Sequence, residues 1–375
     1  MTDAALCDFS PLVLPAALGM ERDRIAPADA RGPDYDARYD LHTLVYDAVH
    51  LPDIASVRLF CPPLLNLAPI LREAEIRLDG DRVRLHRRRR HRRFETFDIT
   101  ARARPDRLSV RWRGWRAEAS VHADTDAAPF AGHNCLLTMS RDNPLRWVRD
   151  WAAFHAAEQG ATAALVFDNG STAYSAQALL DTLAGVAGLD VVRVAVVDLP
   201  YGPVPLRGNR SKALFLQTAL LNVARYRFLA RARAVLQNDV DELVVSRSGR
   251  SVFDATVASR AGFVKFRGFW RTPDASGAEM PLHRHHSGIL DDAKPSPAKY
   301  CIVPSGGLRR HAWNVHNLDW LLFSKRFESA EFHYLHCHAL STRWKSATSR
   351  TRRAPTGIDP QARALLDRTL KQYDA

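Results

Sequence analysis

The feature that most limits the fold is a regular alternation of short apolar runs and amphipathic segments, which begins near residue 130. The apolar runs predict buried strands at 135–138, 163–167, 191–197 and 234–237. The segments between them predict helices near 145–160, 175–183 and 211–230. Strands that alternate with helices form a parallel sheet with right-handed crossovers. We therefore expect an α/β domain that binds its ligand at the carboxyl ends of the strands.

The first of these helices has recognisable boundaries. Asn143 suits the N-cap and Pro144 the first helical position, while Gly160 suits the end of the helix. No G-x-G-x-x-G or Walker A sequence occurs, which argues against a dinucleotide site or a P-loop.

Upstream of this domain the pattern has a period of two residues. Alternating segments at 74–78 and 82–86 flank Asp79-Gly80-Asp81, which predicts a β-hairpin. We expect a small antiparallel β module with one solvated face. The expected organisation is an irregular lead-in at 1–50, the β-rich module at 51–130, the α/β domain at 131–346, and a basic tail at 347–375. The tail contains a short helix that Asp359-Pro360 begins.

Composition excludes several classes of protein. Hydrophobic residues are 46% of the 375 and charged residues 25%, which is typical of a globular protein and excludes intrinsic disorder. No apolar run approaches the ~20 residues that span a bilayer, and we find no signal peptide. The 5 cysteines are far apart and form no C-x-x-C, which favours reduced thiols. We expect a cytoplasmic protein, with peripheral contact with the inner membrane as an option.

The chain is basic, with 53 Lys+Arg against 41 Asp+Glu and a net charge of +12. This charge favours a nucleotide, an anionic lipid surface or nucleic acid as a partner. It is densest in the run from Arg87 to Arg93, which is interrupted only by His91. Such a run is usually a solvated loop, but it can also contact anionic lipid. Nucleic acid is disfavoured, because the run lacks interleaved aromatic residues and no nucleic-acid-binding motif accompanies it.

Asp239-Val240-Asp241-Glu242 carries the strongest chemical signal, because it directly follows a predicted buried strand. Two carboxylates at a strand end can converge on one hard divalent cation and leave positions open for a diphosphate. The cation would also stabilise charge on a leaving nucleotide. The alternative is an acidic turn that caps the strand.

Polar residues also end the neighbouring strands. Thr138 and Arg141 follow the first strand, and Asp168 and Asn169 end the second. In a parallel sheet they would lie beside the Asp239 turn, where they suit a base, a ribose or a phosphate. The alternative is turn chemistry, since Asp-Asn-Gly forms a good turn by itself.

Histidines are dense near the C-terminus. They are His311, His316, His333, His336 and His338. A distant histidine could join the aspartate pair as a ligand, because neutral imidazole binds Mn²⁺ or Zn²⁺ well. For each histidine the alternative is an ordinary surface or core residue. His336 and His338 resemble a zinc pair but lack the other expected ligands.

Several of these segments, taken in order, resemble one glycosyltransferase family. The segments are Thr138 to Asn143, Trp147 to His155 with Gly160, Phe167 to Ser171, Gln217 to Tyr226, Asn238 to Leu243, Lys299 to Pro304 with His316, and His336 to Ser341 with Lys345. Their order and spacing over roughly 133–346 are similar to the family-92-type, family-2-like glycosyltransferases with an A-type nucleotide-sugar fold. This chain departs from the family pattern at Asp150 and Cys337, where glutamate and tyrosine are usual.

The resemblance implies a glycosyltransferase A-type fold, a Rossmann-like mixed sheet flanked by helices, and a hexosyltransferase that uses a UDP-sugar and Mn²⁺ (or Mg²⁺). It implies Asp239 and Asp241 at the metal and diphosphate, with His316 as the distal metal ligand. Asp168 and Asn169, with Thr138 and Arg141, would contact the nucleotide sugar. Lys212 or Arg210 would lie near phosphate, and Glu242 would support the aspartates.

The catalytic base is the least determined residue. An inverting transferase needs a carboxylate that takes the proton of the acceptor hydroxyl. Asp274 is the candidate, with Glu279, Asp291 and Asp292 as alternatives, while a retaining enzyme needs no base there.

We expect transfer of a sugar to a glycan or glycolipid acceptor in bacterial surface polysaccharide synthesis. Two other functions stay open. One is a nucleic-acid-binding protein that uses the Arg87–Arg93 run. The other is a metal-dependent phosphodiesterase or nucleotidyltransferase.

Overall fold

A computed structural model describes residues 1–208, 212–274, 280–290, 294–340 and 354–373. Its centre is a large mixed sheet. The strands of its main path, in spatial order, are β1 (Asp3–Cys7), β14 (Val191–Val196), β13 (Ala163–Asp168), β12 (Asn134–Ser140), β15 (Ala234–Gln237), β19 (Ser296–Ile302), β17 (Phe263–Thr272), β18 (Gly288–Ile289) and β21 (Gly357–Ile358). Two more strands, β16 (Glu242–Ser246) and β20 (Glu328–Cys337), pair with each other, and β20 also pairs with β17.

The first five strands on this path are parallel, and β19 is antiparallel to β15. The four strands predicted in this domain are confirmed as β12, β13, β14 and β15. Their near-continuous burial explains why they appear as plain apolar runs, since both faces of the sheet are covered. The 1–50 segment, expected to be irregular, contributes β1 to the edge of this sheet beside β14.

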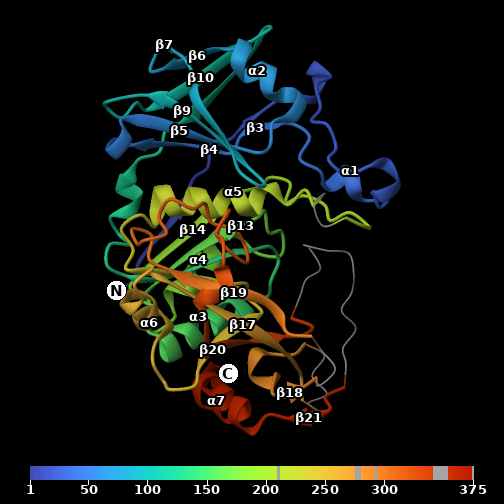
Figure 1. Cartoon of the computed structure of the whole chain (residues 1–375), viewed down its shortest axis with the longest axis vertical. Helices are drawn as coiled ribbons and strands as arrows, with labels where there is room; N and C mark the ends of the chain where they lie inside the picture. The colour runs from blue at the N-terminus through green and yellow to red at the C-terminus, as the bar shows by residue number, and fades with distance from the viewer. Residues whose placement is uncertain (209–211, 275–279, 291–293, 341–353, 374–375) are drawn as a thin grey trace.

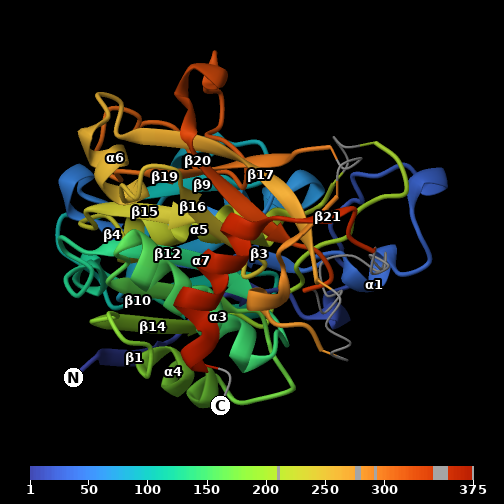
Figure 2. The same ribbon diagram turned by 90° about the horizontal axis from the view of Figure 1, so that it is seen from below.

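Helices cover both faces of the sheet (Figures 1 and 2). One face carries α3 (Leu145–Gln159), α4 (Ala176–Ala184), α6 (Val252–Ala258) and α7 (Pro360–Leu370). The other face carries α5 (Phe215–Val223), which lies between the sheet and the β module. Leu136 and Leu137 of β12 show the alternation, because they belong to the cores on opposite faces.

The predicted helix boundaries hold with two differences. Gly160 ends α3 in the left-handed conformation, φ 69°, as expected. At the other end, however, Pro144 is the N-cap residue, and the Asn143 side chain donates to Ser140 Oγ at 2.8 Å instead of capping. The helix predicted near 211–230 is shorter as an α-helix, since α5 begins at Phe215 and continues after Val223 as the π-helical turn η7 (Ala224–Phe228).

The β module follows β1 in the chain, precedes the rest of this domain, and lies beyond α5 (Figure 1). It contains two four-stranded sheets and a strand pair. These are β4 (Asp47–Leu51), β5 (Ser56–Cys61), β9 (Glu95–Thr100) and β8 (His86–Arg90); β11 (Trp115–Ser120), β10 (Arg107–Trp112), β6 (Glu75–Leu78) and β7 (Asp81–Val83); and β2 (Leu12–Val13) with β3 (Thr43–Val45). Two short helices, α1 (Tyr35–Arg38) and α2 (Ala68–Glu73), accompany them.

The predicted hairpin is confirmed. Its turn is Asp79-Gly80 between β6 and β7, and both turn residues have positive φ, 47° and 95°. The expected architecture, a mixed α/β sheet flanked by helices and preceded by antiparallel β structure, is therefore the one found.

Two further findings concern cysteines and membranes. All five cysteines are unpaired thiols, and four of them are buried. Across the described ranges, no helix combines the length and the hydropathy needed to cross a membrane.

Candidate active site

The acidic turn predicted as a metal site lies at the carboxyl end of β15, between β15 and β16. The turn is closed by its own residues: Glu242 Oε2 accepts from the Asp239 amide at 2.8 Å, and Asn238 Nδ2 donates to the Glu242 carbonyl at 2.7 Å. Glu242 thus fixes the backbone beside the aspartates, and its supporting role in the reaction stays a prediction.

Neighbouring elements clamp the turn from two sides. His283 Nε2 donates to the Val240 carbonyl at 2.7 Å, and the Cys337 amide at the end of β20 donates to the Asp241 carbonyl at 2.8 Å. With its carbonyls held in this way, the turn presents Asp239 and Asp241 in a defined orientation.

Lys299 of β19 is the buried counter-ion of this cluster. Its Nζ lies 2.7 Å from Asp239 Oδ2 and 3.1 Å from Glu242 Oε2. The side chains of Lys299 and Glu242 are 0% and 3% exposed, whereas those of Asp239 and Asp241 are 20% and 19% exposed. Burial raises the pKa of Glu242, and the Lys299 ammonium opposes that rise. The cluster therefore has a buried ion pair beneath two accessible carboxylates.

His336 of β20 holds the second aspartate. Its Nε2 donates to Asp241 Oδ2 at 3.2 Å, and its Nδ1 is hydrogen-bonded to Ser296 Oγ at 2.7 Å, so both ring nitrogens are held. The Trp270 ring stacks on the imidazole with centroids 3.8 Å apart and planes 18° apart. The imidazole ring of His336 is therefore held by hydrogen bonds at both nitrogens and by the Trp270 ring on one face.

His155 of α3 connects this helix to β16, the strand that follows the turn. Its Nδ1 donates to the Trp151 carbonyl at 2.8 Å, and its Nε2 accepts from the Val244 amide at 3.1 Å. Burial lowers the pKa of His155 to about 4, so the ring is neutral at physiological pH and can accept at Nε2.

The polar ends of β12 and β13 lie at the same edge of the sheet, where the Asn169 amide donates to the Ser140 carbonyl at 2.8 Å. The Asp168 carboxylate accepts from the Ser171 amide at 3.1 Å and from Ser171 Oγ at 2.5 Å. Burial raises the pKa of Asp168, and the bonds from Ser171 oppose this rise. Asn169 Nδ2 donates to the carbonyls of Val197 and Leu199 at 2.7 and 2.8 Å. The turn chemistry left open for these two residues is therefore present, and their contact with a nucleotide stays a prediction.

Several buried polar atoms at this edge accept or donate no hydrogen bond within the described part of the chain. They are Thr138 Oγ1, Asn169 Oδ1, Gln237 Oε1 and Asn238 Oδ1. Buried polar atoms in native proteins are nearly always satisfied, so a bound polar ligand is a natural partner for them. Arg141 follows β12 and lines a cavity of about 260 Å³ together with Tyr201 and Gly202. These features lie at the carboxyl ends of the strands, where the alternation predicts the ligand.

Two other predicted residues, His316 and Lys212, lie in connections between secondary-structure elements. His316 is exposed, and its Nδ1 contacts the Ala298 carbonyl of β19 at 3.3 Å. Among the described residues no three His, Cys, Asp or Glu side chains are arranged to hold a metal, so the role of His316 stays a prediction. Lys212 lies in the connection between β14 and α5.

Asp274, the candidate base, is engaged with the C-terminal helix. Its Oδ2 accepts from Arg363 Nη2 of α7 at 2.6 Å and from Ser287 Oγ at 3.2 Å. Its catalytic role stays a prediction. Arg210 and the alternatives Glu279, Asp291 and Asp292 lie outside the described residues.

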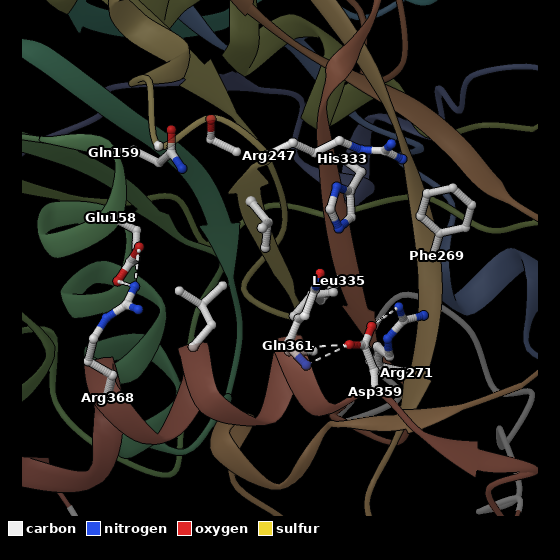
Figure 3. A pocket seen from close by; sticks show the side chains of 15 residues that line it. Glu158, Gln159, Arg247, Phe269, Arg271, His333, Leu335, Asp359, Gln361 and Arg368 are labelled. Carbon is white, nitrogen blue, oxygen red and sulfur yellow. Dashed lines mark hydrogen bonds and ion pairs between the residues drawn. The ribbon is translucent and has the colours of Figure 1, made fainter.

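A larger cavity, of about 730 Å³, lies on the other face of β17 and β20 (Figure 3). Phe269 and His333 line it, whereas Trp270 and His336 belong to the aspartate cluster. Successive strand residues point to opposite faces, so the sheet separates this cavity from the acidic turn.

Ion pairs hold α7 over this second cavity. Arg368 bonds Glu158 of α3 at 2.9 Å, and Arg271 of β17 bonds Asp359, the N-cap residue of α7, at 2.7 Å (Figure 3). Asp359 Oδ1 also accepts from the Gln361 amide, as the predicted start of this helix requires. These ion pairs add to the apolar contacts that dock α7, because Leu366 and Leu370 are buried in the core beneath it.

Sequence reasoning assigned no role to Lys299, His283 or Trp270. Lys299 gave a usable signal, because it precedes the apolar Tyr300-Cys301-Ile302, and a lysine in a buried strand needs a carboxylate partner. His283 and Trp270 gave none, since a histidine or tryptophan in such a context is ordinary.

No protein-family model and no curated protein matches this chain. Among solved structures, the galactosyltransferase LgtC, in complex with donor and acceptor sugar analogs, is 18% identical over 47% of this chain and 60% of LgtC, with a TM-score of 0.27. TarS of S. aureus is 12% identical over 40% of this chain and 23% of TarS, with a TM-score of 0.24. The mannosyltransferase Ktr4p of S. cerevisiae is 12% identical over 40% of this chain and 42% of Ktr4p, with a TM-score of 0.26.

This chain therefore aligns with less than two thirds of each of these proteins. At these identities and scores, the likenesses transfer no activity and no residue role to it.

Proposed function

We propose that this protein is a metal-dependent glycosyltransferase that moves a sugar from a nucleotide sugar to a glycan or glycolipid acceptor. The donor that we propose is a UDP-sugar. The observation that carries the proposal is the pair of accessible carboxylates, Asp239 and Asp241, held at the carboxyl end of β15 above the buried Lys299–Glu242 pair. Surface polysaccharide synthesis in a bacterial cytoplasm, near the inner membrane, is the setting we propose.

The donor set fits a hard divalent cation, Mn²⁺ or Mg²⁺. Carboxylate oxygens are the ligands such cations prefer, and both aspartates reach solvent from a backbone that is already fixed. Asp239 and Asp241 would hold the cation, with His316 as the proposed distal ligand. When bound, the cation would offset the charge of the diphosphate and of the leaving nucleoside diphosphate.

The residues of this chain have separate tasks in the proposed reaction. Lys299 holds Asp239, and His336 holds Asp241, so neither carboxylate swings away from the strand end. Thr138, Arg141, Asp168 and Asn169 would bind the nucleoside and phosphates, with Lys212 near phosphate. The acceptor hydroxyl forms the new glycosidic bond, the bond between sugar and diphosphate breaks, and a base such as Asp274 takes the hydroxyl proton.

The test is calorimetric titration of the protein with UDP, with and without Mn²⁺. We expect micromolar binding that requires Mn²⁺ and is lost in Asp241→Asn, because that change removes half the charge of the pair. Asp81→Asn, at an exposed position in β7, is the matched control and should bind as the wild type does.

Two results would count against the proposal. If Asp239→Asn and Asp241→Asn both leave nucleotide binding and turnover intact, the acidic turn is only a strand cap. If the protein cleaves nucleotides or transfers a nucleotidyl group and no sugar, the phosphodiesterase or nucleotidyltransferase alternative replaces it.

A further inference from the structure

A further cavity, of about 700 Å³, lies between the β module and the turn that follows α5. We call it the arginine cavity. Four separate parts of the chain line it: the segment Leu51–Ile54 with Arg58, the strand residues Arg87 and Arg89, the segment with Tyr226, Ala230 and Arg231, and the loop residues Arg309 and Arg310. Its lining thus holds six arginines and one carboxylate, Asp53.

A bulge in β8 directs two of these arginines into the cavity. The pairing with β9 shifts register between His86 and Arg89, and Arg87 has a positive φ of 47°. Arg88 is engaged elsewhere, at 2.7 Å from Glu95 and over the Phe97 ring. The bulge therefore separates neighbouring arginines of the run: Arg88 forms a salt bridge, whereas Arg87 and Arg89 line the cavity.

Four of the six arginines carry charge that no ion pair among the described residues neutralises. Within the described ranges, no carboxylate forms an ion pair with Arg87, Arg89, Arg309 or Arg310, and all four are exposed. Arg58 differs, because it is buried and bound to both oxygens of Asp98, at 2.7 and 3.0 Å.

Two groups behind the cavity respond chiefly to burial and, to a smaller extent, to these positive charges. Burial lowers the pKa of Arg225, whose guanidinium lies over the Tyr226 ring, and the charge of Arg58 lowers it further. Burial also lowers the pKa of His91 to about 4, with Arg58, Arg89 and Arg225 adding to the effect and Asp319 opposing it.

The arginine cavity is remote from the acidic turn. Val235 at the start of β15 pairs with Ile302 at the end of β19, and Arg231 and the Arg309 loop lie beyond that end of the two strands. The acidic turn follows the other end of β15, after Gln237. A ligand in the arginine cavity therefore does not occupy the proposed transfer site.

We propose that the arginine cavity is a second binding site, which takes a ligand with clustered phosphate groups. Guanidinium groups that approach from four parts of the chain suit phosphate, because each phosphate has several terminal oxygens that accept from different arginines. A volume of about 700 Å³ suits a discrete phosphorylated ligand or head group.

The test uses inorganic tripolyphosphate as the probe, titrated calorimetrically into the full chain at low salt and at about 0.15 M salt. The variant Arg89→Ala/Arg309→Ala/Arg310→Ala removes three exposed arginines of the cavity. We expect its affinity to fall at least about tenfold for each arginine that contacts phosphate.

The matched control is Arg82→Ala/Arg84→Ala/Arg102→Ala. It removes the same charge from exposed positions of the β module that do not line the cavity. Tripolyphosphate binding by this control should stay within about twofold of the wild type, and both triple variants should melt as the wild type does.

A second experiment distinguishes a soluble phosphorylated ligand from a phosphorylated lipid head group. Vesicles of phosphatidylglycerol are compared with vesicles of phosphatidylcholine in a sedimentation assay of the same three proteins. Binding to tripolyphosphate that only the cavity variant loses supports a soluble or terminal phosphate ligand. Binding only to the anionic vesicles, again lost only in the cavity variant, supports a lipid head group. Absence of both, or equal loss in the control, overturns the proposal.

Discussion

The two ends of strand β15 carry opposite charges and differ in construction. At the carboxyl end, Asp239 and Glu242 share a buried lysine, and neighbouring strands and loops hold the backbone of the turn. At the other end, Arg309 and Arg310 reach solvent with no ion pair among the described residues. The first arrangement is part of the core, so its charges serve folding as well as the proposed binding. The two arginines lie on the surface, so we expect them to contribute little to the stability of the core.

The largest expected effect is that of Lys299→Met, which leaves Asp239 and Glu242 without their buried cation. Removal of one partner of a buried pair costs about 3–5 kcal/mol in the free energy of unfolding. Urea denaturation of the wild type and the variant measures this difference in the free energy of unfolding. Lys299→Met/Glu242→Gln should recover part of the loss, because it no longer buries an unpaired carboxylate. A single variant as stable as the wild type would remove the distinction between the two ends.

A smaller effect concerns pH and His155, which accepts from the Val244 amide below the acidic turn. Burial lowers its pKa from 6.5 to about 4, so the unfolded chain takes up a proton below pH 6.5 that the folded chain refuses until about pH 4. The stability contributed by the neutral ring is present above pH 6.5 and is lost as the pH falls through this window. By linkage the loss from this one histidine is about 2 kcal/mol at pH 5.

Urea denaturation at several pH values between 7 and 5 measures this loss. His155→Gln should start less stable at pH 7 and show a shallower decline on acidification. Parallel curves for the two proteins would show that His155 does not remain neutral in the folded chain.

The smallest effect is expected at the other end of the strand. Arg309→Ala should change the free energy of unfolding by no more than about 0.5 kcal/mol, because the side chain is exposed and forms no ion pair among the described residues. A loss comparable to that of Lys299→Met would show that the arginines are structural, and that the two ends are built alike.

The sequence was most informative where local chemistry decides the structure. The strands β12 to β15, the Asp79-Gly80 turn and the glycine that ends α3 each follow from residues within a few positions of one another. The acidic turn could be located for the same reason, because its carboxylates are adjacent in the chain.

The partners of those carboxylates could not be predicted, because they come from distant segments. Lys299 and His336 meet the aspartates only after β19 and β20 have taken their places in the sheet. The arginine cavity shows the same limit: the Arg87–Arg93 run was conspicuous, but the bulge that separates Arg88 from its neighbours, and the loop that supplies Arg309, are products of tertiary structure.

Strand β1 has a consequence for the order in which the protein folds. It pairs residue by residue with β14, from Asp3 opposite Val191 to Cys7 opposite Ala195. During synthesis β1 therefore leaves the ribosome long before its partner, and the whole β module is made in between. Contacts of such long sequence separation form slowly. A nascent chain thus carries an unpaired strand until the sheet exists, which makes the early segment a natural client for a chaperone.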